Sequence, residues 1–389
     1  MTRRHSALFS GAALLLFAAC SGDDASITTP TTALGNDSTV PGDSIPADLD
    51  VVAGEAFPAD RCELNKAAGP ITYLSSFDYA ASASIVDVLV AESKGYYEAL
   101  CLDVEIRSSF SLTNYPLIAA NEAQFSSAGS FSEMADFAGA NDAGFVALAV
   151  EGRTGADVLI TKDGAVASIA DIKGAKIGVK GAITASVKAM LAAEGLVEGT
   201  DYETVALTGF DPLVHIETPG IVGFPGYRAN EPLTLAANDI PIKVYDPSDF
   251  GIPGSFGIVY TNHVFLEENP TAAQDFMRAT MRGLADAVAD PQAAAEICVE
   301  KINANGNANF LSPEGEIARW GVESKLVNEG ATAAKPLGVP QADLLEAEVT
   351  TYAAAGLFGG VAPVIDTMYD ATVLEGLYDD TGKVIWPAG

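Results

Sequence analysis

Positive charge is scarce in this chain of 389 residues. It has 21 lysines and arginines against 52 aspartates and glutamates, which gives a formal net charge of −31 at pH 7. Such a surface repels phosphate backbones and anionic lipid headgroups, so nucleic acid is not expected to be a partner. Hydrophobic residues nevertheless make up 49% of the sequence. The composition therefore predicts a folded body with a real core and an acidic surface, not a disordered acidic tail.

Common catalytic motifs are also missing. The sequence has no Gly-x-Ser-x-Gly elbow and no glycine-rich phosphate loop. It has 3 histidines, which lie far apart, and 4 cysteines, which are not clustered. We therefore expect no enzyme activity, no cofactor and no metal site. A Ser-His-Asp triad assembled from distant residues stays open.

The first twenty residues have the three-part form of an export signal. Arg3 and Arg4 precede an uncharged apolar run at 7–19, and small residues come directly before Cys20. A helix needs about 20 apolar residues to span a bilayer core, so this run is too short to be a membrane anchor. We expect residues 1–19 to be removed as a signal peptide. No later segment is long and apolar enough to span.

The segment ending at Cys20 resembles the bacterial lipobox, in which a diacylglycerol is attached to the cysteine thiol. The resemblance implies an extracytoplasmic protein anchored to the cell membrane through its lipid. Phe17 stands where the lipobox usually has Leu, Val or Ile. An ordinary secretory signal with an incidental cysteine is the alternative.

Residues 20–65 are predicted to be the lipidated cysteine followed by a flexible linker. Ser, Thr, Asp, Pro and Gly dominate this segment, and it lacks the periodic apolar pattern that a packed element requires. A linker of ~40 such residues has a typical reach of ~35 Å. The roughly 330 residues that follow exceed what one compact core usually organises, so two lobes are expected.

Three cysteines remain after Cys20. Cys62 and Cys101 lie just before the first and second predicted strands, so a disulfide between them would join the entry of the chain to neighbouring structure. Bridged and free states both stay open. Cys298 lies on a helical pattern, and we expect it to be a small buried hydrophobic residue.

From residue 70 onward, short apolar runs alternate with helical segments, which is typical of strand-helix-strand units and a largely parallel sheet. Strands are predicted at 71–77, 103–108, 124–128, 145–150, 157–161, 176–179, 204–207, 221–224, 242–245 and 258–261. Helices are predicted at 84–100, 115–123, 131–138, 184–194, 270–288, 291–303, 313–329 and 341–355, with another that opens near 230–232.

These elements predict an α/β protein with one lobe inserted into another. The first lobe comprises residues 66–155 and is completed by a helical part at 258–389, while the second lobe is 156–257. Two crossing segments, near 151–156 and 254–258, would form a hinge with a ligand cleft between the lobes.

Several segments resemble a known family. Ala-Glu-Ser-Lys-Gly-Tyr-Tyr-Glu at 91–98, with Leu-Asp-Val-Glu at 102–105, is similar to SsuA-like substrate-binding proteins of ABC transporters, and segments 173–181, 226–232 and 281–284 agree. This group serves thiamine pyrimidine precursors, riboflavin, alkanesulfonates, taurine and nitrate. The resemblance implies a type 2 periplasmic-binding fold that closes on a small molecule and delivers it to a membrane permease.

Ligands of open α/β sheets lie beyond the carboxyl ends of strands, so residues that follow predicted strands are the candidate ligand contacts. One ring of Phe77 or Tyr79 is expected to stack on the ligand. The full set is Ser75, Phe77, Asp78, Tyr79, Ser127, Gly129, Ala182, Thr184, Tyr227, Asn230 and Glu231.

Two of these clusters are helix starts. Ser127 and Gly129 precede the predicted helix at 131–138, while Ala182 precedes the helix at 184–194 and Thr184 stands at its cap. Backbone N–H groups at helix starts favour acceptors or negative charge. Plain capped helices are the alternative.

The cluster at 227–231 combines a ring, an amide and a carboxylate. Asn230 either contacts the ligand or caps the helix that follows it. Asp246 and Trp320 are further candidates, although a single tryptophan on a helix usually belongs to the core.

Arg228 is the only arginine in these clusters. A sulfonate or nitrate binder would present a fixed cation or a donor-lined pocket, whereas rings and carboxylates suit a neutral or basic heteroaromatic compound. We expect a monomer that captures such a compound, for example a thiamine pyrimidine precursor or a riboflavin-like molecule. The alternatives are import of alkanesulfonate, taurine or nitrate, a surface sensor or adhesion domain, and a pyrimidine-synthase-like enzyme, whose cysteine-rich iron motif is absent.

Overall fold

The computed structural model describes residues 45–306 and 311–388. The predicted signal peptide, Cys20 and the first part of the predicted linker lie outside the described residues. None of the helices in these two ranges combines the length and apolar character that a membrane span requires.

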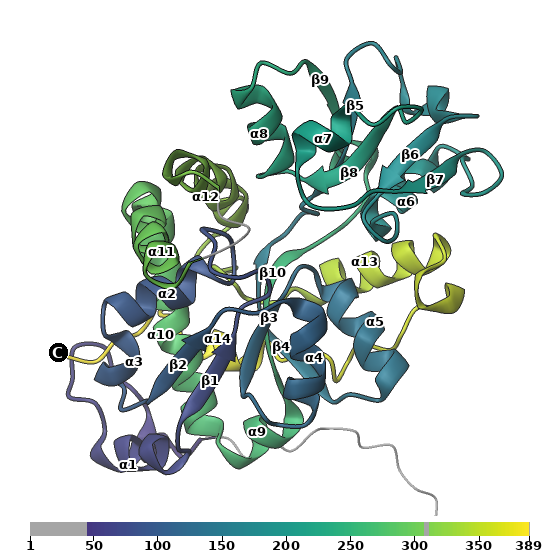
Figure 1. The fold of residues 1–389 in the computed structure, drawn as a ribbon. Coiled ribbons are helices and arrows are strands. Elements are labelled where there is room, and N and C mark those ends of the chain that lie inside the picture. Colours follow the sequence, from purple (N-terminus) through teal and green to yellow (C-terminus); the bar gives the residue numbers. More distant parts are fainter. Residues whose placement is uncertain (1–44, 307–310, 389) are drawn as a thin grey trace, which may run out of the picture. The chain divides into compact units, whose positions relative to one another are not determined.

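Lobe 1 is built on a five-stranded sheet of order β2-β1-β3-β10-β4 (Figure 1). Its strands are β1 Ile71–Leu74, β2 Val104–Arg107, β3 Phe125–Ala128, β4 Phe145–Gly152 and β10 Phe256–Asn262. β1 runs parallel to β2 and β3, whereas β10 runs antiparallel to β3 and β4.

Lobe 2 repeats this arrangement in a second five-stranded sheet of order β7-β6-β8-β5-β9. Its strands are β5 Asp157–Lys162, β6 Lys176–Val179, β7 Glu203–Ala206, β8 Gly223–Tyr227 and β9 Ile242–Tyr245. β5 runs antiparallel to β8 and β9, while β6 is parallel to β7 and β8. In each sheet the reversed strand is the one that the chain enters after crossing between lobes, so the expected largely parallel sheets each contain one antiparallel strand.

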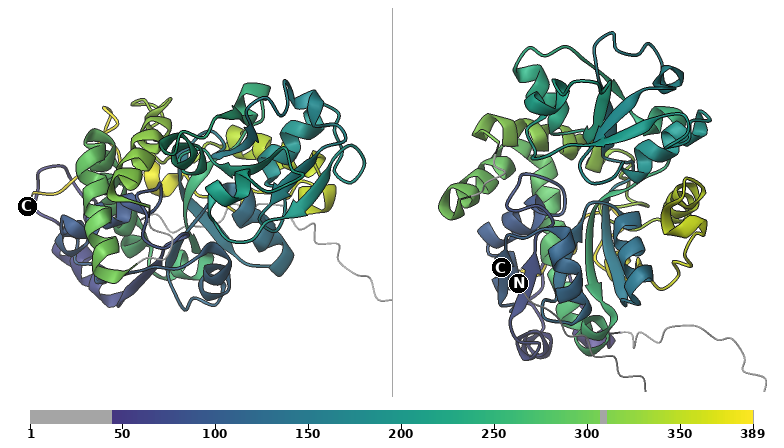
Figure 2. Two further views of the ribbon diagram at one scale, coloured as in Figure 1. Left: turned by 45° about the horizontal axis from the view of Figure 1, so that its top comes forward. Right: turned by 45° about the vertical axis from the view of Figure 1, so that its right-hand side comes forward.

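Helices cover both sheets. Lobe 1 has α1 Ala59–Ala67, α2 Val86–Ser93, α3 Tyr96–Ala99, α4 Ser111–Ala119, α5 Phe131–Asn141, α9 His263–Glu268, α10 Pro270–Ala289, α11 Pro291–Asn305, α12 Pro313–Asn328, α13 Ala342–Ala354 and α14 Thr372–Glu375. Lobe 2 has α6 Ala185–Ala193, α7 Pro212–Ile216 and α8 Glu231–Ala237. α10, α11 and α12 pack against one another (Figure 2), and α13 packs against both α5 and α6, so it contacts both lobes.

One of the two hydrophobic clusters of lobe 1 lies between its sheet and α10, and the other lies on the side of α4 and α5. Phe125 of β3 stacks on Phe276 of α10 with ring centroids 3.9 Å apart. α2 and α10 approach closely at Gly283, because a Cβ there would stand 2.2 Å from the Asp87 carbonyl oxygen. Trp320 is fully buried and donates its indole N–H to the Ala287 carbonyl at 2.9 Å. Trp320 is therefore a core residue and not the ligand contact considered from the sequence.

The helix predicted at 84–100 is interrupted. α2 ends at Ser93 and α3 begins at Tyr96, because Gly95 has a φ of 67°, in the left-handed region that glycine adopts without steric cost. The helix predicted at 115–123 begins earlier, at Ser111. α7, α9 and α14 are short helices that the sequence pattern did not indicate.

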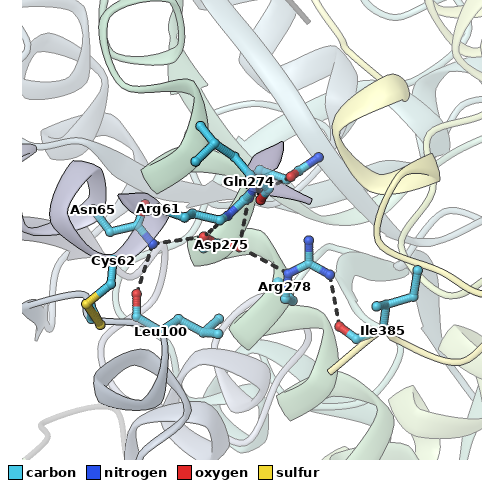
Figure 3. A network of polar contacts seen from close by, with 10 residues as sticks. Arg61, Cys62, Asn65, Leu100, Gln274, Asp275, Arg278 and Ile385 are labelled. Carbon is cyan, nitrogen blue, oxygen red and sulfur yellow. Dashed lines mark hydrogen bonds and ion pairs between the residues drawn. A yellow bond between two sulfur atoms is a disulfide. The ribbon is translucent and has the colours of Figure 1, made fainter. Parts of the chain in front are cut away.

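The prediction of a flexible linker up to residue 65 is wrong at its carboxyl end. Residues Ala47–Leu49 form a 3-10 turn and α1 begins at Ala59. The physical reason is a buried polar network that attaches α1 to α10 (Figure 3). A disulfide between Cys62 and Cys101 holds the same helix to the segment before β2.

Asp275 of α10 is the centre of this network. Its carboxylate accepts hydrogen bonds from Arg61 Nε at 2.6 Å and Nη2 at 2.9 Å, from Asn65 Nδ2 at 2.8 Å, and from Arg278 Nε at 3.0 Å. Arg61 also donates to the Leu49 carbonyl. The network thus joins the start of the described chain to the long helix of lobe 1.

Candidate functional site

A cavity of about 580 Å³ lies between the two lobes. Residues that follow β1 and β3 line it from lobe 1, and residues that follow β6, β7 and β8 line it from lobe 2. This is the edge of each sheet where loops leave the carboxyl ends of the parallel strands, which is where ligands bind in such folds. Both lobes therefore contribute to a single cleft.

Aromatic rings enter the cavity from both lobes. Phe77 follows β1 and makes an edge-to-face contact with Phe110, with ring centroids 5.8 Å apart. Phe210 follows β7 and stays 60% exposed although it lines the cavity. Tyr227 at the end of β8 packs partly against the core of lobe 1. A flat ligand would find ring surfaces on each side.

Both cations of the cavity are already paired. Lys180 Nζ lies 2.7 Å from Glu231 Oε1, and Glu231 is almost fully buried. The guanidinium of Arg319 on α12 contacts both carboxylate oxygens of Glu316, at 3.0 and 3.1 Å. It also donates to Asn230 Oδ1 at 3.3 Å, which links α12 of lobe 1 to α8 of lobe 2. Each cation thus has a carboxylate beside it that balances its charge, and each keeps further N–H donors.

Three backbone N–H groups of the loop that follows β1 also donate to carboxyl groups. Ala81 N donates to Glu316 at 2.8 Å, Ala83 N to Glu323 at 2.7 Å, and Ser84 N to Glu151 at 2.9 Å. Carboxyl groups from α12 and β4 thus hold the floor of the cavity.

Burial raises the pKa of carboxyl groups in the floor of the cavity and of Asp87, which is hydrogen-bonded to Glu151. It raises the pKa of Glu323 from its ordinary value of 4.5 to about 7. Burial likewise raises the pKa of Asp87 to about 6, and burial together with the nearby charge of Asp87 raises the pKa of Glu151. Groups with raised pKa values bind protons more readily in the folded state than in the unfolded state, so this region is less stable at higher pH.

Replacing Glu323 with glutamine is expected to flatten the dependence of stability on pH. Between about pH 4.5 and 7 the folded state holds a proton on Glu323 that the unfolded state has lost, so wild-type stability falls as pH rises through this window. The variant has no such group to titrate. Melting temperatures between pH 5 and 8 measure the slope, with Glu314→Gln, exposed on the same helix, as control. Equal slopes for Glu323→Gln and the wild type would contradict the prediction.

The structure brings five of the predicted contacts to this cavity, namely Phe77, Gly129, Tyr227, Asn230 and Glu231. Thr184 lies instead in a second, adjoining cavity. Ser75, Asp78, Tyr79, Ser127 and Ala182 line neither.

The reason is the direction of each side chain. Ser75 is buried and donates its hydroxyl to the Asp78 carbonyl. Tyr79 is buried and donates to the Ile106 carbonyl at 2.9 Å. The Ser127 hydroxyl accepts from Ser76 N at 2.8 Å. These groups hold the loop in place and do not face the cleft.

The helix that follows Ser127 and Gly129, α5, begins as a capped helix, which is the alternative stated for these two residues. Ser132 N donates to Glu348 at 3.0 Å, Glu133 N to Ser130 Oγ at 3.2 Å, and Gly129 N to the Glu133 carboxylate at 3.2 Å. These amides therefore already have acceptors within the protein. Asn230 differs, because its side chain makes no cap and its Oδ1 accepts from Arg319.

Sequence reasoning missed Lys180, Phe210 and Arg319. Lys180 comes directly after β6, so the strand-end rule would have found it. Phe210 follows β7 after a short loop and gives a weaker signal of the same kind. Nothing in the pattern of α12 distinguished Arg319. Asp246 pairs with Arg228 at 2.5 Å, which places a carboxylate beside the one arginine that the predicted clusters contained.

Taken together, two matching five-stranded α/β sheets, two crossing connections and a cleft at the strand ends define a two-lobed substrate-binding protein with the type 2 periplasmic-binding fold. The chain belongs to the NMT1/THI5-like family, whose model matches residues 82–294. The fold and the family resemblance predicted from the sequence are confirmed.

Individual relatives agree with this assignment. The chain is 26% identical over 222 residues to the riboflavin-binding protein RibY of Chloroflexus aurantiacus, a match that covers 55% of this chain and 60% of RibY. The periplasmic aliphatic sulphonate binding protein SsuA of Escherichia coli has a TM-score of 0.54 at 14% identity, covering 73% of this chain and 85% of SsuA. The periplasmic nitrate-binding protein NrtA of Synechocystis PCC 6803 has a TM-score of 0.54 at 14% identity, covering 79% and 87%. At these identities the two structures show a shared fold.

Within the described ranges, no group of three or more histidine, cysteine, aspartate or glutamate side chains is placed to hold a metal ion.

Proposed function

We propose that this protein is an extracytoplasmic solute-binding lipoprotein of an ABC importer that captures a neutral heteroaromatic compound by lobe closure. Thiamine pyrimidine precursors and riboflavin-like compounds are the proposed ligands. The observation that carries the proposal is the pairing of Lys180 and Arg319 with Glu231 and Glu316, in a cavity that the rings of Phe77 and Phe210 line from the two lobes.

Charge disfavours the second candidate, an alkanesulfonate, taurine or nitrate ligand. A bound anion would need a free cation or several free N–H donors. The amides of Ala81, Ala83 and Ser84 already donate to carboxyl groups, as described above. The remaining N–H donors of Lys180 and Arg319 would hold an anion only against the charges of Glu231 and Glu316 beside them. A neutral ring meets no such repulsion.

Aromatic surface favours a flat ligand. A ring held between side chains of both lobes contacts more surface in the closed state than in the open state, so its binding shifts the lobes towards closure. Phe77 belongs to lobe 1 and Phe210 to lobe 2, and both line the cavity. The match to a protein named for riboflavin binding agrees with this choice of ligand.

The remaining parts of the proposal concern the place and partners of the protein. We propose that the lipid on Cys20 anchors a monomer to the cell membrane. One lobe comprises residues 66–155 and 258–389, the other comprises residues 156–257, and an ABC permease receives the ligand that they hold. Anchoring keeps the receptor at a high effective concentration near its permease. A surface sensor without a permease is the alternative, and unchanged ligand uptake in cells that lack the gene would favour it.

Replacing Phe210 with alanine is expected to weaken ligand binding by about tenfold, because the variant loses the ring contact from lobe 2. Calorimetric titration of the purified body with riboflavin and with 4-amino-5-hydroxymethyl-2-methylpyrimidine measures the affinity. Val197→Ala, an exposed apolar position of lobe 2 outside the cavity, is the matched control. Binding of ethanesulfonate or nitrate in the absence of any binding by these ring compounds would overturn the proposed ligand class.

A further inference from the structure

A second cavity of about 560 Å³ adjoins the first one. Gly129 and Tyr227 line both cavities, so the two are neighbouring parts of one cleft. Tyr115 and Glu133 contribute to the second cavity from lobe 1. Asp157, Thr184 and Ser186 contribute from lobe 2.

The side chains of this second cavity include strong acceptors without cations. Glu133, Asp136 and Asp157 line it, and among the described residues that line it there is no lysine or arginine. The one hydrogen bond recorded for the Asp157 carboxylate is a long one, from Ser186 Oγ at 3.4 Å. Burial, and then the charges of Glu231 and Glu133, raise the pKa of Asp157 to about 7. Near neutral pH this carboxyl group is therefore present in both its accepting and its donating form.

Donor groups face the same cavity. The first turn of α6 begins at Ala185 and has no side-chain cap, so its N–H groups remain available. The Thr184 hydroxyl at this turn is buried without a hydrogen-bond partner within the described part of the chain. Buried polar groups of this kind are costly unless a ligand or water satisfies them.

We infer that the second cavity binds a hydroxylated chain carried by the same ligand whose ring occupies the first cavity. This inference rests on the proposed function and specifies its ligand class as a heteroaromatic ring with a polyol substituent. A hydroxyl group donates to the Asp157 and Glu133 carboxyl groups and also accepts from the first turn of α6. An ammonium group would leave the α6 donors unsatisfied, and an anionic group would face the three carboxyl groups of Glu133, Asp136 and Asp157. Tyr227 lies at the boundary between ring and chain.

The test compares two ligands that share one ring system. Riboflavin carries a hydroxylated chain, and lumiflavin carries a methyl group in its place. Several added hydrogen bonds are expected to make riboflavin bind at least about tenfold tighter than lumiflavin to the wild-type protein. Quenching of flavin fluorescence on titration with the purified body measures both dissociation constants.

Two substitutions assign the preference to the second cavity. Thr184→Val and Asp157→Asn are each expected to weaken riboflavin binding about fivefold and to leave lumiflavin binding unchanged. Retained lumiflavin binding also shows that each variant is folded. Thr350→Val, an exposed position on α13, is the matched control and is expected to bind both flavins like the wild type.

The possible outcomes separate this inference from the proposed function. Equal affinity for riboflavin and lumiflavin would contradict the inference that the second cavity binds a hydroxylated chain. It would not contradict the proposal that the first cavity binds a ring. Tighter binding of a flavin with an aminoalkyl chain than of riboflavin would also overturn the inference. If neither flavin nor the aminopyrimidine binds, the proposed ligand class fails and this inference fails with it.

Discussion

Replacing Asp275 with alanine is expected to lower the free energy of unfolding by about 3–5 kcal/mol. The Asp275 carboxylate is fully buried and lies between two guanidinium groups, those of Arg61 and Arg278. Removing it leaves both guanidinium groups buried without their hydrogen-bonded carboxylate, and Asn65 loses an acceptor at 2.8 Å. Urea unfolding followed by circular dichroism measures the change.

The matched control is Asp286→Ala on the same helix. Asp286 pairs with Lys94 at 2.8 Å, but these side chains are 33% and 42% exposed. Asp286 also accepts a hydrogen bond from Tyr96 at 2.6 Å. Because exposed pairs contribute about 0–1 kcal/mol and a hydrogen bond about 1 kcal/mol, this variant should lose far less stability than Asp275→Ala. A loss of less than about 1 kcal/mol for Asp275→Ala, with an unchanged slope against urea, would contradict the central role of Asp275.

Removing the disulfide by the double substitution Cys62→Ala and Cys101→Ala is expected to cost about 2–4 kcal/mol. The bond joins residues separated by 39 positions, so its loss gives the unfolded chain more conformational freedom. It also releases α1 from the segment before β2. The melting temperature with and without reductant measures the effect.

Reductant supplies the internal control for this second prediction. It should lower the melting temperature of the wild type towards that of the double variant and should not change the variant itself. A wild-type protein whose melting temperature is insensitive to a reductant that breaks the bond would refute the prediction.

The order of strands and helices could be predicted because most strands are buried on both faces. All eight residues of β4 are buried, and its first six, 145–150, appear in the sequence as an unbroken apolar run. The strand periodicity did not reveal the reversed directions of β5 and β10. Pairing direction depends on where the chain returns between lobes, which no local pattern records.

Helix α1 could not be predicted for a physical reason. Its buried side chains include Arg61 and Asn65, which are polar and resemble solvated linker residues when partners are unknown. Their partner Asp275 lies 214 and 210 positions away in the chain. Only the folded structure brings these charges together.

The candidate site was predictable in position but not in detail. The strand-end rule placed Phe77, Tyr227 and Glu231 at the cleft. It could not tell that Ser75 and Tyr79 turn their hydroxyl groups towards backbone carbonyls. The pairing of the cleft cations was hidden as well, since it depends on residues that a local pattern does not connect.

The floor of the cleft also has a consequence for the order of assembly during synthesis. The amides of Ala81 and Ala83 find their acceptors in Glu316 and Glu323, which follow them by 235 and 240 positions. A chain made from its amino terminus completes all the strands of lobe 2 before α12 exists. The receptor therefore gains its binding surface late, when nearly the whole polypeptide is present, and an unfinished chain has no mature cleft in which a ligand could be trapped.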